Sequence, residues 1–157
     1  MWFSRKQLVK APPGQVDDLT GLKGAGPEPT GQITTKRRGD AAEAAARAYL
    51  LQAGLQWLES NYRTPGRGGG EIDLIMRSPD GTLVFVEVRQ RSSQSHGGAG
   101  ASISALKQRR IIFAARHYLM RFASLPPCRF DVVLVQGVAG IGSPASIEWL
   151  QAAFDAS

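Results

Sequence analysis

The alternation of apolar and polar positions predicts a strand over residues 71–77. Ile72, Leu74 and Met76 fall on one face of this strand, and Asp73 falls on the other. A carboxylate inside an apolar strand is costly to bury unless a cation or a hydrogen-bond donor lies beside it. The pattern therefore marks Asp73 as a candidate functional residue.

A second strand is predicted over residues 82–90, after a turn. Residues 78–81 read Ser-Pro-Asp-Gly, with proline and glycine at the second and fourth turn positions, so the two strands form a hairpin. The second strand is apolar on both faces up to Glu87. One face carries Val84, Val86 and Val88, and the other carries Leu83, Phe85, Glu87 and Arg89. We expect this strand to be central in its sheet and covered on both sides.

Helical patterns lie on either side of this hairpin. Asp40 is a natural N-cap, and Glu43 three residues later completes a capping box, so the first helix is predicted to begin at Asp40 and to stop at Gly54. A longer helix is predicted over about residues 103–122. Its apolar positions recur at the spacing of a core-facing surface: Ile111, Ile112, Ala115, Tyr118, Leu119 and Phe122.

The remaining elements complete an α/β pattern. Residues 55–62 and 128–135 are predicted to be strands, residues 146–150 a short edge strand, and residues 151–155 a helical turn. The order helix, strand, hairpin, helix, strand (αβββαβ) predicts a mixed β-sheet flanked by helices. Asp131, which lies within an apolar strand, is expected to pair with a basic group such as Arg129.

Residues 1–37 are predicted to be an extension without regular structure, and residues 38–157 to form a single domain. The extension is rich in glycine and proline and has neither helical nor strand periodicity. It leads into a basic cluster, Lys36-Arg37-Arg38, which is either a solvated tail or an arm that contacts phosphates.

Composition narrows the classes of function. The net charge is +6 at pH 7, which points weakly to polyanionic partners. The single cysteine, Cys128, forms no internal disulfide or thiolate metal cage. No stretch approaches the roughly 18 apolar residues of a membrane span. The first residues lack the apolar run of a secretory signal, so a cytoplasmic protein is expected.

The hairpin brings Asp73 and Glu87 together near its open end, on neighbouring strands. Two hard oxygen ligands at this separation suit Mg²⁺ or Mn²⁺, and the backbone carbonyl of Val88 is a further candidate ligand. The alternative is an ion pair between Arg89 and one of the carboxylates, since acids at strand ends are common at surfaces. Glu43 is explained locally by its capping box and a helical pair with Arg47.

Three motifs stand out along the chain: Gly70–Ile75 (GEIDLI), Val84–Arg89 (VFVEVR) and Arg129–Val133 (RFDVV). Together with Ala48–Leu50, Gly54, Asn61–Arg63, Lys107 and Arg110, they resemble the YraN-type family of bacterial endonuclease-like proteins. That family is similar to Holliday-junction resolvases and to the wider PD-(D/E)xK, or restriction-endonuclease-like, group. The resemblance covers about residues 39 to 135, with the motifs in the family's order.

The resemblance implies a restriction-endonuclease-like fold in which Asp73 and Glu87 bind the metal and Glu43 reaches the same site from the first helix. In the wider group, a lysine two residues after the second acid orients or activates the attacking water. Arg89 stands at that position here. An arginine keeps its proton and cannot act as a general base, although it can hold a phosphate. Lys107 is a candidate substitute, but its spacing does not show whether it reaches the site.

The resemblance also implies DNA as the partner, in a branched or otherwise structured form. The expected phosphate contacts are Lys107, Arg109 and Arg110 on the second helix and Arg67 in the glycine-rich loop. Lys107 and Arg110 belong to a basic stripe that continues to His117 and Arg121, although such a stripe is more often a solvated helix face. Related resolvases often form symmetric dimers, and the sequence has no diagnostic dimer interface.

Two functional classes follow from these residues. The first is a metal-dependent endodeoxyribonuclease, a phosphodiester hydrolase in which metal-bound water attacks the backbone. The second is a non-catalytic module that keeps the nuclease fold and binds nucleic acid or a protein partner in DNA processing. Arg89 at the usual lysine position leaves both open.

Overall fold

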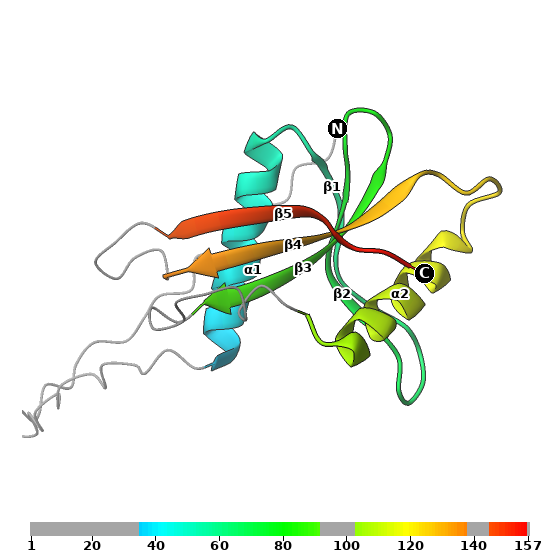
Figure 1. Cartoon of the computed structure of the whole chain (residues 1–157), viewed down its shortest axis with the longest axis horizontal. Helices are drawn as coiled ribbons and strands as arrows, with labels where there is room; N and C mark the ends of the chain where they lie inside the picture. The colour runs from blue at the N-terminus through cyan, green and yellow to red at the C-terminus, as the bar shows by residue number, and fades with distance from the viewer. Residues whose placement is uncertain (1–34, 92–102, 138–144, 157) are drawn as a thin grey trace, which may run out of the picture. The chain divides into compact units, whose positions relative to one another are not determined.

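The computed structural model describes residues 35–91, 103–137 and 145–156. These residues form two helices and five strands (Figure 1). In chain order the elements are α1 (Thr35–Gln52), β1 (Gln56–Arg63), β2 (Glu71–Arg77), β3 (Leu83–Arg91), α2 (Ala105–Leu119), β4 (Cys128–Gln136) and β5 (Ser146–Phe154). The predicted α/β class is confirmed.

The five strands form one mixed sheet in the order β1-β2-β3-β4-β5. Strands β1, β2 and β3 are antiparallel neighbours, β4 runs parallel to β3, and β5 is antiparallel to β4. The parallel step follows the crossover through α2, because parallel neighbours need a long connection. Strand β3 is central, as predicted, and its residues Leu83 to Val86 are fully buried.

Each face of the sheet packs against one helix. Figure 1 shows α1 crossing behind β3, β4 and β5. The α1 face is built around Ala42, Ala46 and Leu50, which pack against Leu74, Met76 and the valines of β3. The α2 face is built around Ile111, Ala115 and Tyr118, which pack against Phe85, Phe130 and their neighbours. Because β3 is covered on both sides, any polar group on it needs a partner.

The start of α1 differs from the prediction. The helix is already formed at Thr35, so Asp40 lies inside it and is not an N-cap, and the capping-box explanation of Glu43 is wrong. Lysine and arginine are good helix formers, and a single glycine costs a helix only about 1 kcal/mol, so the basic cluster extends the helix through Gly39. Residues 35–37, assigned to the extension, are helical, and the rest of the predicted extension lies outside the described residues.

The end of the chain also differs from the prediction. Residues 151–154 continue β5 and do not form a helical turn. The pairing with β4 shifts register between Phe130 and Val132, and Ala152 has a positive φ of 48°. The shift lets Ala152 donate its N–H to Asp131 (2.9 Å) and brings Phe154 onto Phe130, with ring centroids 4.9 Å apart. These tertiary contacts explain why local sequence does not predict the longer strand.

Two neighbouring strands are irregular at the level of Asp73. Ile72 packs on the α2 face, whereas Leu74 and Met76 pack on the α1 face, so the predicted grouping of these three residues is wrong for Ile72. On β1, Asn61 has a φ of 54°, and it lies between the pairs Ser60↔Leu74 and Tyr62↔Ile72. The backbone of both strands therefore turns at the candidate site.

Among the described residues, no helix has the length and apolar character needed to cross a bilayer.

Candidate metal centre

The candidate centre lies where β2 and β3 separate. Their backbone pairing runs from Arg77↔Leu83 to Leu74↔Val86, and the next residues along the two strands are Asp73 and Glu87. Beyond this point the Asp73 side chain replaces the backbone pairing between the two strands, because its Oδ2 accepts the N–H of Val88 at 2.8 Å. The N–H and C=O of a strand residue point to the same side, so the Val88 carbonyl also faces Asp73.

The carboxyl groups of Asp73 and Glu87 form a close pair that shares a hydrogen bond. Burial raises the pKa of Glu87 to about 7, and the negative charge of Asp73 adds to the rise. Burial also raises the pKa of Asp73, and the hydrogen bond from Val88 opposes that rise. When both acids ionise, two negative charges lie side by side, and a divalent cation is a species whose charge would offset them.

Lys107 reaches this pair from α2. Its Nζ lies 3.1 Å from Oε2 of Glu87, and its charge lowers the pKa of Glu87. Ser104 caps the helix by accepting the Lys107 N–H, which fixes the first turn against the sheet. Oε2 of Glu87 is buried, and the Lys107 ammonium contacts it in an ion pair whose geometry falls outside that of a regular hydrogen bond.

Lys107 lies at the margin of the basic stripe of α2 and turns toward the sheet. Its side chain is 37% exposed, and it precedes the buried Ile111, Ala114, Ala115 and Tyr118 by 4, 7, 8 and 11 positions, on the core-facing side of the helix. This spacing was the signal in the sequence for a lysine that reaches the sheet. Of the other stripe members, His117 pairs with the Tyr62 hydroxyl, and the Arg121 guanidinium lies 3.9 Å from the centroid of the Tyr118 ring.

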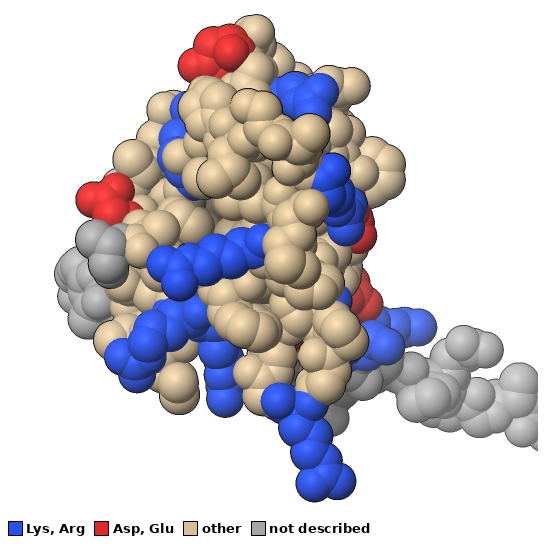
Figure 2. Space-filling view, turned by 90° about the vertical axis from the view of Figure 1, so that its right-hand side faces the viewer, with Lys and Arg blue, Asp and Glu red and all other residues tan. Residues whose placement is uncertain are grey.

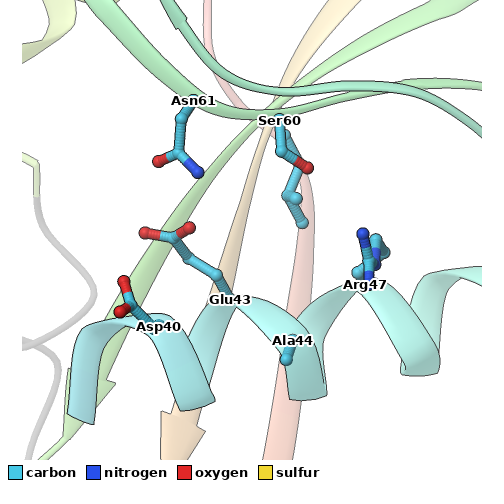
Figure 3. Close-up of a pocket in the computed structure, with 7 residues that line it drawn as sticks. Asp40, Glu43, Ala44, Arg47, Ser60 and Asn61 are labelled. Atoms are coloured by element: carbon cyan, nitrogen blue, oxygen red, sulfur yellow. The ribbon is translucent and has the colours of Figure 1, made fainter. Parts of the chain in front are cut away.

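Glu43 approaches from α1, on the other side of the sheet. Burial raises the pKa of its carboxyl, the charge of Asp73 adds to the rise, and a hydrogen bond with the Asn61 side chain opposes it. Figure 3 shows the Glu43 carboxylate directed toward the Asn61 amide, with Asp40 beside it at the edge of a pocket. The positive φ of Asn61, which asparagine tolerates well, turns its side chain toward α1.

The residues present fit a hard divalent cation. Asp73 and Glu87 offer carboxylate oxygens, Glu87 Oε2 is a buried acceptor without a regular hydrogen bond among the described residues, and the Val88 carbonyl belongs to the residue whose N–H binds Asp73. Within the described ranges, no three acidic, histidine or cysteine side chains are grouped closely enough to hold a metal on their own. Two carboxylates completed by waters and a phosphate suit Mg²⁺ or Mn²⁺ better than a closed, all-protein site.

Sequence left open an ion pair between Arg89 and one of the two carboxylates, and the structure places Lys107 beside Glu87. Arg89 lies on the same strand, two residues beyond Glu87, and is partly buried. The position two residues after Glu87 is therefore an arginine, and the lysine amine beside Glu87 comes from α2.

The expected phosphate contacts lie near the start of α2. Gly70 packs so closely on this helix that a Cβ there would stand 1.9 Å from the carbonyl oxygen of Arg110, so the loop carrying the exposed Arg67 lies against α2. Arg109 and Arg110 are exposed. Figure 2 shows Lys and Arg side chains spread over the side of the molecule where α2 runs, with acidic side chains toward its margins.

Asp131 is a different kind of buried acid. It is fully buried, and its carboxylate accepts hydrogen bonds from Arg129, Trp149 and the Ala152 N–H. The predicted partnership with Arg129 is confirmed. Because every bond comes from the protein, Asp131 holds β4 to β5 and has no need of a cation.

A five-stranded mixed sheet with a helix on each face, and acids on two adjacent strands at its fork, has the α/β architecture of the restriction-endonuclease-like core. The chain belongs to the family described as "Uncharacterised protein family UPF0102", whose sequence model matches residues 42–135. This is the YraN-type group that the motifs predicted.

Relatives of the same family name resemble the chain along most of its length. A UPF0102 protein of Polaromonas naphthalenivorans (strain CJ2) is 76% identical, and one of Polaromonas sp. (strain JS666 / ATCC BAA-500) is 69% identical, each over 100% of both chains. A UPF0102 protein of Methylibium petroleiphilum is 60% identical over 80% of this chain and 99% of its own.

Proposed function

We propose that this protein is a Mg²⁺- or Mn²⁺-dependent DNA endonuclease that acts on branched or otherwise structured DNA. The observation that carries the proposal is the Asp73–Glu87 pair, a half-buried and a buried carboxyl at the fork of a hairpin, with Lys107 3.1 Å from Glu87. A purely structural pair would cost stability, since both groups resist ionisation there. A bound cation would offset that cost, because it favours the ionised form of both carboxyls.

Each residue has a distinct part in the proposed reaction. Asp73, Glu87 and the Val88 carbonyl would hold the cation, which would supply Lewis-acid chemistry at the phosphodiester. Lys107, beside Glu87, would place a protonated amine where negative charge develops on the phosphate. Arg89 would hold the phosphate, and Glu43 would add negative charge to the site from α1, where its carboxyl already feels the charge of Asp73.

The partner follows from charge and from the family resemblance. Phosphate contacts from Arg67, Arg109 and Arg110 would hold a backbone across the start of α2, close to Lys107. These contacts fit any nucleic acid, and the preference for branched DNA rests on the likeness to Holliday-junction resolvases.

The direct test is cleavage of labelled four-way junctions, forks and linear duplexes with Mg²⁺ or Mn²⁺. We expect junctions or forks to be cut, and cutting to stop with chelator and in Asp73→Asn. Glu148→Gln, at an acid paired with Arg91 on the far edge of the sheet, is the matched control and should cut normally. Equal cutting by Asp73→Asn would assign the products to a contaminant.

A second function is favoured by one residue. Arg89 at the usual lysine position suits a DNA-binding module with the nuclease fold and no turnover, in which arginine clamps a phosphate. Binding that persists in Asp73→Asn and Glu87→Gln, without products under either metal, would select this function over the endonuclease.

A further inference from the structure

A groove leads away from Glu43 between α1 and β1. Its first part is a pocket of about 230 Å³ bordered by Glu43, Arg47, Ser60 and Asn61 (Figure 3). Its second part is a hollow of about 500 Å³, lined by Arg47, Leu51, Gln56 and Trp57. The two hollows share Arg47 as a lining residue, so they adjoin at that side chain, and Glu43 stands on the wall of the first.

Trp57 is an exposed aromatic ring held in place. It is 44% exposed, on the edge strand β1. Its Nε1 donates a hydrogen bond to Ser60 Oγ at 2.9 Å, and the Arg47 guanidinium lies 5.3 Å from the ring centroid. A ring that is already fixed loses little freedom when a flat ligand stacks on it. Because Trp57 is exposed and lies on an edge strand, packing in the core does not explain why its ring is held by Ser60 and Arg47.

The chemistry changes in order along the groove. Glu43, Arg47 and Leu51 are four residues apart on α1, so they lie on one face of the helix. Glu43, beside the candidate metal centre, lies at one end, and the Arg47 guanidinium lies in the middle. The apolar Leu51 and the aromatic Trp57 lie at the other end. A nucleotide strand has matching parts, since a phosphate bound at the metal is followed by the next phosphate and an unpaired base.

We propose that this groove binds the unpaired strand next to the cleavage site, with Trp57 stacking on a base and Arg47 contacting a phosphate. The proposal rests on the nuclease function above and adds to it a subsite for single-stranded nucleic acid. Stacking on an aromatic ring tolerates any base, so the subsite selects for strand separation and not for sequence. It gives forks and junctions, which expose unpaired nucleotides, an advantage over intact duplex.

A docked protein fits the groove less well. The apolar members of the second hollow are Leu51 and Trp57, and the charged Arg47 separates them from the acidic first pocket. Protein interfaces bury a larger apolar centre with few charges in it. The alternation of charge and aromatic surface favours the nucleotide.

The test compares a fork carrying a single-stranded arm with a blunt duplex of the same paired sequence, using full-length protein in Ca²⁺ to prevent turnover. We expect Trp57→Ala to bind the fork about 10-fold more weakly, since loss of one stacked base costs this much. The affinity of Trp57→Ala for the blunt duplex should stay within about 2-fold of the wild-type affinity, because a duplex offers no unpaired base for stacking. Arg47→Gln should weaken fork binding in the same selective way, and thermal unfolding of each variant checks that the fold is kept.

A second readout does not depend on the alanine variant folding. Oligo(dT) bound to the wild type should quench tryptophan fluorescence, and the quenching should be lost in Trp57→Phe. Trp149→Phe, which removes a ring bonded to Asp131, is the matched control and should keep it. Quenching retained in Trp57→Phe, or a fork affinity unchanged in Trp57→Ala, would overturn the subsite while leaving the nuclease proposal standing. Absence of binding to both DNAs by the wild type would overturn both.

Discussion

The side-chain nitrogen of Lys107 lies 3.1 Å from Oε2 of Glu87, although the two residues are 20 positions apart and come from a helix and a strand. The ion pair ties the first turn of α2 to the open end of the β2–β3 hairpin. It also brings a lysine amine to the Asp73–Glu87 pair. On β3 itself, the position two residues after Glu87 is the arginine Arg89. Glu87 thus has one positive partner in the ammonium group of Lys107, and the proposed divalent cation would be a second.

Lys107→Met should reduce cleavage by 100-fold or more, on the order of the loss seen when one preorganised charge at a reacting group is removed. Methionine keeps the length of the side chain and removes the charge. Single-turnover cleavage of a labelled junction at saturating protein measures the effect. Arg77→Gln, at the closed end of the hairpin, is the control, and undiminished cleavage by Lys107→Met would exclude a catalytic part for the lysine.

A lysine introduced at a second position should restore part of the cleavage activity that Lys107→Met loses. In Lys107→Met, the further change Arg89→Lys places an amine two residues after Glu87, where the wider nuclease group carries it. We expect the double variant to recover at least 10-fold of the lost single-turnover rate, since one positioned acid–base group contributes about this much or more. A double variant no better than Lys107→Met would show that the amine is not the missing group.

The stability of the metal-free protein should fall as the pH rises from about 4.5 to about 7. The pKa of Glu87 is raised from 4.5 to about 7 by burial and by Asp73, so the folded state binds more protons than the unfolded state in this window. The free energy of unfolding should drop by on the order of 1–3 kcal/mol across it. Urea unfolding in chelator at pH 5 and pH 8 measures the change.

Glu87→Gln should remove most of this pH dependence, and Mg²⁺ should restore the wild type at pH 8, because a cation favours the ionised carboxylates. The comparison of wild type and variant cancels the titration of the groups that do not interact with Glu87, so the difference reports the Asp73–Glu87 pair. An identical pH profile for both proteins would show that Glu87 is ionised normally in the folded state.

The close contact of the β1–β2 loop with α2 should make Gly70 irreplaceable. A Cβ at Gly70 would lie 1.9 Å from the Arg110 carbonyl oxygen, so Gly70→Ala should destabilise the protein by about 1–3 kcal/mol or more. Gly39→Ala is the matched control, since a Cβ there meets nothing within 4 Å and Gly39 lies inside α1. It should stabilise by about 0.5–1 kcal/mol. Equal melting temperatures for the two variants would contradict this packing.

Binding of a labelled fork should depend on salt through the arginines near α2. Replacing Arg110 or Arg67 with glutamine should weaken binding at low salt and reduce the slope of log affinity against log salt by about 1 each. Arg77→Gln, far from the open end of the hairpin, should leave the slope unchanged. A uniform effect of all three would mean that binding follows net charge alone.

The hairpin and its acids were predictable because they depend on local patterns. Alternation defined β2 and β3, a Pro-Asp-Gly turn joined them, and a two-residue period brought Asp73 and Glu87 to the same end. The apolar run on both faces of β3 identified the central strand. These are signals within one or two adjacent elements, where periodicity is strongest.

The rest of the site depends on contacts between distant elements. The turn of β1 at Asn61 brings the Asn61 amide to Glu43, 18 residues earlier in the chain. No pattern in the neighbouring sequence predicts this turn. The length of β5 depends on the hydrogen bond from Ala152 to Asp131. The position of Lys107 could have been predicted, because its spacing from Ile111 and Tyr118 puts it toward the core-facing side of α2.

The central claim is that Asp73 and Glu87 together bind a divalent cation. Anomalous diffraction from crystals of the protein soaked in Mn²⁺ tests it most directly. We expect one strong peak roughly 2 Å from a carboxylate oxygen of each residue and near the Val88 carbonyl, and no such peak in crystals of Asp73→Asn. A wild-type map with no peak between these two side chains at saturating Mn²⁺ would contradict the account.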